Sequence, residues 1–163
     1  MSIIDQAKLA ASNFIHAFNA QDHQAIAKTL NYPHIRLAKG EFQTIANQEE
    51  IAVLSEQGEN RLRNESWAHT VVESMEPIHV GEDKVHLAIK NHRVTKSGDI
   101  YDSFETLWIV TLNDHHWGIQ FRSSYLRYAI HRTIEASQSV PVFDLVPNHQ
   151  QQIQYAQYTH QNV

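Results

Sequence analysis

The sequence of 163 residues contains no cysteine, which excludes disulfide bonds and metal sites built from thiolates. It also lacks any apolar run of about 18 residues, the length that a membrane-spanning helix needs. The N-terminal segment has neither the basic region nor the apolar region of a secretory signal peptide. We therefore expect a cytoplasmic protein without disulfides and without a membrane partner.

Positive charge is also scarce, because 13 lysines and arginines stand against 18 aspartates and glutamates. The formal net charge is −5 at pH 7 with neutral histidines, and there is no basic stripe of the kind that nucleic-acid-binding proteins carry. Histidines are many, at 12, but none forms a His-x-x-x-His pair on a predicted helix. A histidine metal site is therefore our weakest hypothesis, and we expect no metal, no other cofactor and no nucleic acid.

The first half of the chain alternates helical and extended patterns. Apolar residues recur at intervals of three and four over residues 3–20, which is typical of an amphipathic helix. Asp22 and Asn47 are N-cap residues for two further helices. The expected elements are helices over residues 3–20, 23–30 and 48–57, short strands over 34–38 and 41–45, and a polar loop over 58–65.

Four strand-like runs follow, over residues 66–80, 85–95, 101–112 and 117–125, and short turns join each run to the next. Pairing across the turn at Ser97 places Leu87 opposite Trp108 and Arg93 opposite Asp102. Continuing the same alternation across the next turn places Trp108 opposite Phe121. The fold class expected is α+β, a cone-shaped and strongly curved, mostly antiparallel sheet wrapped over the N-terminal helices.

The inward face of this meander collects polar residues at one end. As the catalytic residues we expect His69, a base held by Glu73 or Asp102, and Tyr125, a hydrogen-bond donor. Arg93 is placed to bind a carboxylate, because a guanidinium can do so bidentately. The residues expected to contact a ligand are His34, Arg36, Trp67, Glu73, Asn91, Arg93, Phe104, Trp108, Phe121 and Ser123.

Each of these assignments has a structural alternative. A strand histidine such as His69 can instead hydrogen-bond a backbone carbonyl, and the pair of Arg93 and Asp102 can serve stability alone. The aromatic residues can be core rather than pocket. The absence of an obvious base and acid aimed at one point leaves a non-enzymatic ligand-binding protein as the alternative to an acid–base enzyme.

The outward face carries Ala88, Leu107 and Ile109 between charged residues that include Arg122. An apolar stripe with charged edges suggests an interface, and we expect a homodimer through this face. The alternative is cover by the C-terminal segment. We place a domain at residues 1–126 and an extension at 127–163, with a helix over 126–136, an apolar extended segment over 140–147 and a Gln- and His-rich tail that is poorly ordered.

The order of elements, the segment FIHAFNAQD at residues 14–22 and the start Trp117-Gly118-Ile119 of the last strand resemble the nuclear-transport-factor-2-like superfamily. That group includes the SnoaL-like cyclases, ketosteroid isomerase, scytalone dehydratase and limonene epoxide hydrolase. The pattern YPH…W-x-H…WGIQ-x-RSS is most similar to uncharacterised bacterial members. The resemblance implies a small apolar pocket, a homodimer through the sheet and, for an enzyme, a cofactor-independent lyase, isomerase or hydrolase.

The sequence departs from the isomerase pattern at the positions that carry the chemistry. The segment that would supply the carboxylate base, residues 34–38, contains no Asp or Glu. Phe14 stands where a tyrosine is expected, and Glu105, aligned with the second acid, is turned outward beside Lys90. No Asp-Arg-Asp relay is apparent. The resemblance therefore supports small-molecule binding more directly than it supports a particular reaction.

Overall fold

The computed structural model of the protein describes residues 1–126. This part of the chain forms three helices and six strands, with two helices before the first strand and the third helix after the second strand. The elements are α1 (Ile3–Asn19), α2 (His23–Lys28), β1 (Leu30–Ala38), β2 (Glu41–Ile45), α3 (Gln48–Asn64), β3 (Trp67–Val80), β4 (Lys84–Thr95), β5 (Ile100–Asn113) and β6 (His116–Ser124).

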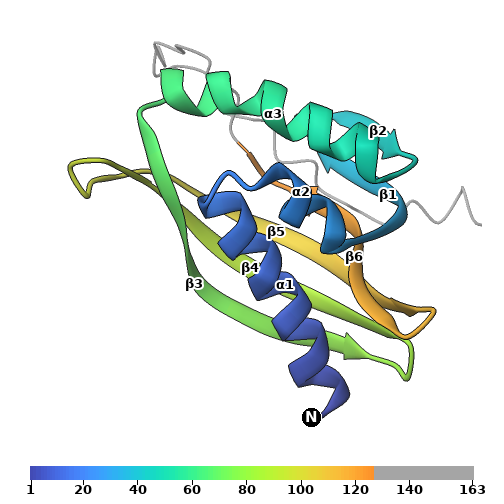
Figure 1. Cartoon of the computed structure of the whole chain (residues 1–163). Coiled ribbons are helices and arrows are strands. Elements are labelled where there is room, and N and C mark those ends of the chain that lie inside the picture. Colours follow the sequence, from blue (N-terminus) through green and yellow to red (C-terminus); the bar gives the residue numbers. More distant parts are fainter. Residues whose placement is uncertain (127–163) are drawn as a thin grey trace, which may run out of the picture. The chain divides into compact units, whose positions relative to one another are not determined.

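The curved sheet has the strand order β2-β1-β6-β5-β4-β3. Neighbouring strands are antiparallel, except that β1 and β6 run parallel. Figure 1 shows α1 crossing one face of strands β3 to β5, with α2 and α3 beyond its C-terminal end. This arrangement confirms the expected α+β class and the antiparallel meander of the last four strands.

Helix α1 begins at a complete capping box, because Ser2 and Asp5 satisfy each other's backbone amides. Its buried face carries small residues, and Ala7 and Ala11 are fully inaccessible to solvent. Small side chains let the helix approach the sheet closely. The larger Phe14 then meets Trp108 edge to face, with ring centroids 5.2 Å apart.

The register of β4 against β5 is the one predicted. Leu87 pairs with Trp108, Lys90 with Glu105 and Arg93 with Asp102. Most inward members of this hairpin, including Leu87, are buried, whereas Glu105 is exposed. Hydrophobic alternation therefore determines which side chains of these two strands face the core. A slip of the register by one residue would turn all the buried apolar side chains of one strand toward solvent.

The register of β6 is predicted correctly only at its start. Val110 pairs with Ile119 as expected, but Ile109 then pairs with Phe121 and Trp108 with Arg122. A β-bulge therefore leaves Gln120 as an extra residue, and every later side chain of β6 changes face. The prediction that Trp108 opposes Phe121 is wrong, and so is the outward placement of Arg122.

The side chain of Gln120 accounts for the bulge. Its Nε2 donates to the Pro33 carbonyl at 2.6 Å, and its Oε1 accepts from Thr111 at 3.0 Å and from Asn113 at 3.1 Å. Three partners from two neighbouring strands hold this amide. The hydrogen bonds offset the lost ladder pairing at the extra residue.

Helix α3 is longer than predicted, because it continues through Gly58 to Asn64. The expected loop over residues 58–65 is therefore wrong. Glu and Arg are good helix formers, Arg61 and Arg63 lie in the last turn, and Leu62 is buried. Packing of Leu62 outweighs the cost of Gly58. The predictions made for residues 127–163, and for the domain boundary before them, lie outside the described residues.

Candidate functional site

A cavity of about 280 Å³ lies between the inward face of the sheet and helices α1 and α3. Aromatic and aliphatic side chains from both layers form much of its wall, and no acidic residue of the described chain lines it. Its apolar lining residues are Phe14, Ile15, Phe18, Ile26, Ile45, Ile51, Leu54, Leu62, Phe104, Trp108 and Leu126. Its polar lining residues are Arg36, Gln43, Ser55, Arg61, Thr70, Asn91, Arg93, Arg122 and Ser124.

Arg122 enters the cavity because of the bulge in β6. Its guanidinium lies over the Phe14 ring, 4.3 Å from the centroid, and 5.9 Å from the centroid of Trp108. Its Nε donates a hydrogen bond of 3.1 Å to His34 Nε2. Removal from solvent, and then the nearby Arg36 guanidinium, lower the pKa of Arg122 to about 9. The side chain is thus a cation held against aromatic faces.

His34 lies behind Arg122 and is fully buried. Its Nδ1 donates to the Ile119 carbonyl at 2.9 Å, because a carbonyl can only accept, and its Nε2 is therefore free to accept from Arg122. Burial, and then the charge of Arg122, lower the pKa of His34 to about 3. His34 is consequently neutral and accepts a hydrogen bond from Arg122. Although it is among the residues expected to contact a ligand, it does not line the cavity.

Arg36 stands beside Arg122, since the two residues are direct partners across β1 and β6. Burial, and then the charges of Arg61 and Arg93, lower the pKa of Arg36. No carboxylate among residues 1–126 forms an ion pair with either Arg36 or Arg122. The cavity wall therefore holds two adjacent cations that have no counter-ion among the described residues.

The other two arginines of the lining share one acid as their ion-pair partner. Glu65, which caps α3, pairs with Arg93 at 2.6 Å and with Arg61 at 3.7 Å. Tyr101 also donates to Glu65, at 3.2 Å. The predicted partner of Arg93 was Asp102, but the Arg93 guanidinium bonds Glu65 and lies over Phe104. This network joins the end of α3 to the sheet.

Asn91 adds an unusual polar group to the cavity wall. It is 1% exposed, and its Oδ1 has no hydrogen-bond partner among the described residues. An unsatisfied buried amide costs about 1–3 kcal/mol. A buried polar group without a partner therefore does not contribute to stability and needs another explanation.

Five of the residues predicted to contact a ligand do line this cavity: Arg36, Asn91, Arg93, Phe104 and Trp108. Trp67 is buried beside it, where it meets Phe18 edge to face and its Nε1 donates to Thr70. These residues lie on β1, β3, β4 and β5, whose facing the alternation predicts. Their role in binding stays a prediction.

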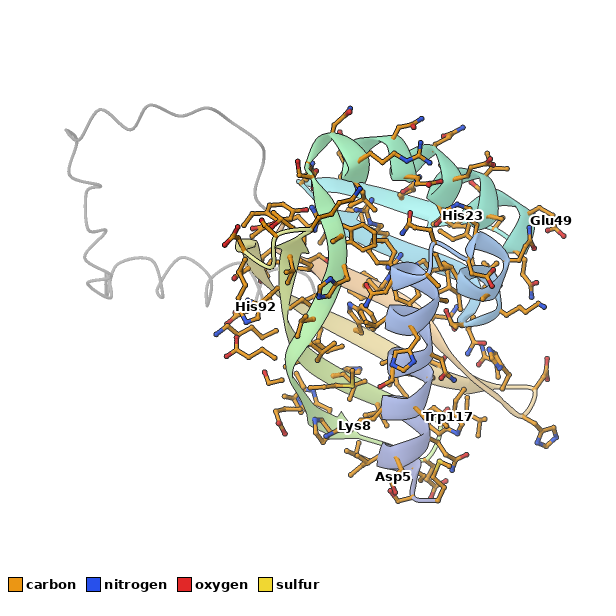
Figure 2. All side chains as sticks on the ribbon, turned by 60° about the vertical axis from the view of Figure 1, so that its left-hand side comes forward. Asp5, Lys8, His23, Glu49, His92 and Trp117 are labelled. Carbon is orange, nitrogen blue, oxygen red and sulfur yellow. The ribbon has the colours of Figure 1, made fainter. Side chains whose placement is uncertain are left out.

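The predicted base His69 and its partner Glu73 do not face the cavity. The β3 register shifts between Trp67 and His69 and again beyond Val72, so that His69 is exposed. Glu73 instead lies on the outer face, with Lys90 at 2.9 Å and His92 at 2.6 Å. Figure 2 shows His92 on the side of the sheet away from α1.

The remaining predicted site residues also lie away from the cavity. Tyr125 is 74% exposed, and Asp102 does not line the cavity although it pairs with Arg93 in the sheet. Phe121 and Ser123 pair with Ile109 and Leu107 and so share the outer face. The bulge replaces them on the inner face with Arg122 and Ser124.

Sequence patterns gave no sign of Arg122 as a site residue. Residues 117–123 alternate with a period of two, which places every second side chain on one face. Gln120 falls on the polar phase of this alternation, so it does not mark the bulge. A bulge at that position depends on partners that are 7 to 87 residues away in sequence.

Two further results concern metal binding and membrane insertion. Within residues 1–126, no group of three or more histidines, aspartates or glutamates is placed to hold a metal ion. Helices α1 to α3 are too short or too polar to cross a membrane.

Comparison with known proteins identifies the architecture. No protein-family model and no curated sequence matches the chain. Solved structures do match. A nuclear-transport-factor-2-like protein with a cystatin-like fold from Novosphingobium aromaticivorans has a TM-score of 0.62 at 12% identity, over 78% of this chain and 83% of its own. A ketosteroid-isomerase-like protein from Erwinia carotovora atroseptica has a TM-score of 0.57 at 15% identity, over 74% and 93%.

A third structure is named for the calcium/calmodulin-dependent protein kinase II association domain and comes from Xanthomonas campestris. It has a TM-score of 0.54 at 15% identity, over 76% of this chain and 88% of its own. The TM-scores establish the fold, and identities this low leave the activity open. The chain has the nuclear-transport-factor-2-like, cystatin-like fold, as its sequence resemblance predicts.

Proposed function

We propose that the protein binds a small molecule with an apolar body in the cavity between α1, α3 and the sheet. The observation that carries this proposal is the lining of the cavity, which combines eleven aromatic and aliphatic side chains with nine polar ones. Small-molecule sites are concave and combine apolar walls with polar groups that orient the ligand. The volume of about 280 Å³ favours a compact ligand, since it lies near the lower end of the roughly 300–1,000 Å³ that such sites span.

Binding without acid–base catalysis is the better-supported form of this function. An acid–base enzyme needs a base within hydrogen-bond reach of its substrate. The lining supplies guanidinium, amide and hydroxyl groups and no carboxylate or imidazole among the described residues. The residues first considered for acid–base roles, His69 and Tyr125, are exposed.

Calorimetric titration with an uncharged two-ring probe, naphthamide, tests the proposal. Leu54 lines the cavity from α3, so Leu54→Trp would fill the space and lower the affinity for naphthamide by about tenfold or more. Val53, its neighbour on the same helix, is 53% exposed, and Val53→Trp is the matched control that leaves binding unchanged. No binding to the unaltered protein, or equal binding by both variants, would contradict the cavity as the site.

A second proposal is that two copies associate through the outer face of the sheet. Ile35, Leu107, Ile109 and Phe121 lie there and are only partly buried. The bulge strengthens this surface because it turns Phe121 outward. The structural match to an association domain is consistent with such a role, although that name describes the other protein.

Light scattering coupled to size-exclusion chromatography tests the association. We expect the mass of a dimer for the unaltered chain and of a monomer for Ile109→Glu, because a buried unpaired charge opposes association. Glu105→Lys, on the same strand and already exposed, is the control for a charge change. A monomer without any substitution would rule out the dimer and leave cover by residues 127–163 as the alternative.

A further inference from the structure

We infer that the ligand carries an anionic group, a carboxylate or a phosphate monoester, and that Arg36 and Arg122 bind it while His34 positions Arg122. This inference rests on the proposed function, since it names the class of molecule that the same cavity takes. It differs from the sequence-based expectation, which gave the carboxylate to Arg93.

The first support is the distribution of charge. The whole chain has a formal net charge of −5, yet four arginines and no acidic residue of the described chain line the cavity. Glu65 pairs with Arg61 and Arg93 from outside that lining, and its single charge offsets only one of their two. An acidic protein that concentrates cations in an apolar cavity incurs repulsion and desolvation, and an anion of the ligand would relieve both.

The second support is the availability of hydrogen-bond donors. Nε of Arg122 is used by His34, and no residue of the described chain accepts from its two terminal amino groups. The Arg36 side chain forms no hydrogen bond with a described residue, although its backbone pairs with β2 and β6. A guanidinium has donors in a fixed planar fork that matches two oxygens of a carboxylate or phosphate. The two adjacent arginines therefore offer a set of unused donors suited to one such group.

The third support is the way in which Arg122 is held. Phe14 packs on one face of the guanidinium, and His34 accepts from Nε, so both the plane and the rotation of the group are constrained. His34 is itself constrained by the Ile119 carbonyl. A fork that is oriented before the ligand arrives loses less entropy on binding. An arginine that served only to fill space would need no such support.

The charge state of His34 suits this role. A neutral imidazole accepts a hydrogen bond, whereas a protonated one could only donate and would repel Arg122. Burial and the neighbouring Arg122 both favour the neutral form. The groups around it are the Arg122 guanidinium and the Ile119 carbonyl, together with the more distant Arg36.

The test compares three probes that share one apolar body: naphthamide, naphthoate and naphthyl phosphate. Calorimetry on the full chain is expected to show at least one of the two anions binding about tenfold or more tightly than naphthamide. The preferred anion then distinguishes a carboxylate ligand from a phosphate monoester. Because this comparison needs no substitution, it does not depend on the folding of any variant.

Variants locate the anion. Arg36→Met and Arg122→Met are each expected to lower the affinity for the preferred anion about tenfold and to leave naphthamide within about twofold. Arg63→Met, which alters an exposed arginine of α3, is the control and changes neither. For the positioning role, His34→Leu is expected to lose the preference for the anion, and His34→Gln to retain it, because its side-chain oxygen can accept from Arg122.

The outcomes separate the two proposals. If naphthamide binds and neither anion binds more tightly, the anion site is wrong and the cavity proposal stands. If neither naphthamide nor the anions bind, the cavity proposal fails, and the anion site fails with it. If Arg63→Met weakens anion binding as much as Arg122→Met does, the preference comes from surface charge and the assignment to Arg36 and Arg122 is overturned.

Discussion

Protonation of His34 is expected to destabilise the folded protein as the pH falls. In the folded chain burial and Arg122 lower its pKa from 6.5 to about 3. In the unfolded chain the imidazole is solvated and takes up a proton below about pH 6.5. Between these two values the unfolded state binds more protons than the folded state, so stability decreases as the pH is lowered through that window.

The size of the effect follows from the two pKa values. At pH 8 the histidine is neutral in both states and contributes no pH dependence. At pH 5 it is mostly protonated in the unfolded state and mostly neutral in the folded state. The corresponding loss of unfolding free energy is about 2 kcal/mol, a large fraction of the roughly 5–15 kcal/mol that stabilises a domain.

Urea unfolding at pH 8 and pH 5 measures this loss, and His34→Gln separates it from the contributions of the other histidines. The variant lacks the ring Nδ1–H that donates to the Ile119 carbonyl, so we expect it to be less stable at pH 8 by about 1–2 kcal/mol. The difference in unfolding free energy between the variant and the unaltered protein should shrink or reverse at pH 5, because glutamine does not titrate. Parallel pH dependence in the two proteins would refute the buried neutral state of His34, and with it the acceptor role toward Arg122.

Two further predictions concern stability. Gly118→Ala would place a Cβ 2.8 Å from Asn31 Oδ1 and 2.9 Å from its backbone nitrogen, so we expect a loss of about 1–3 kcal/mol in urea unfolding. Gly58→Ala meets nothing within 4 Å in the middle of α3 and should gain up to about 1 kcal/mol, and equal effects of the two changes would contradict the packing described. Asn91→Leu removes the unpartnered buried amide at similar volume, and we expect the unfolding free energy to rise by about 1 kcal/mol. A marked fall instead would show that the amide has a partner.

Much of the fold could be predicted because its signals are local. The helix of residues 3–20 is marked by spacing and by Ser2 with Asp5, and α1 begins at that capping box. The β4–β5 register follows from matching apolar and charged residues across one short turn. Helix α3 shows the limit of local signals, because Gly58 and the polar residues around it predict a loop, whereas burial of Leu62 keeps the helix intact.

The candidate site was predictable where strands keep a regular alternation. Arg36, Asn91 and Trp108 lie on such stretches, and they line the cavity. His69 lies just beyond a register shift in β3, and the shift turns it outward. A strand argument of period two is correct up to the first bulge and is inverted after it.

The sequence by itself determined the order of the elements, the facing of β4 and β5, and a cavity wall of mixed aromatic and polar residues. Only the tertiary structure decided which residue of β6 enters that wall. Gln120 bonds Pro33, Thr111 and Asn113, and these contacts exist only once β1, β5 and β6 are assembled. The bulge that they stabilise exchanges Phe121 for Arg122, and places a cation beside Arg36 where alternation alone predicts an apolar ring.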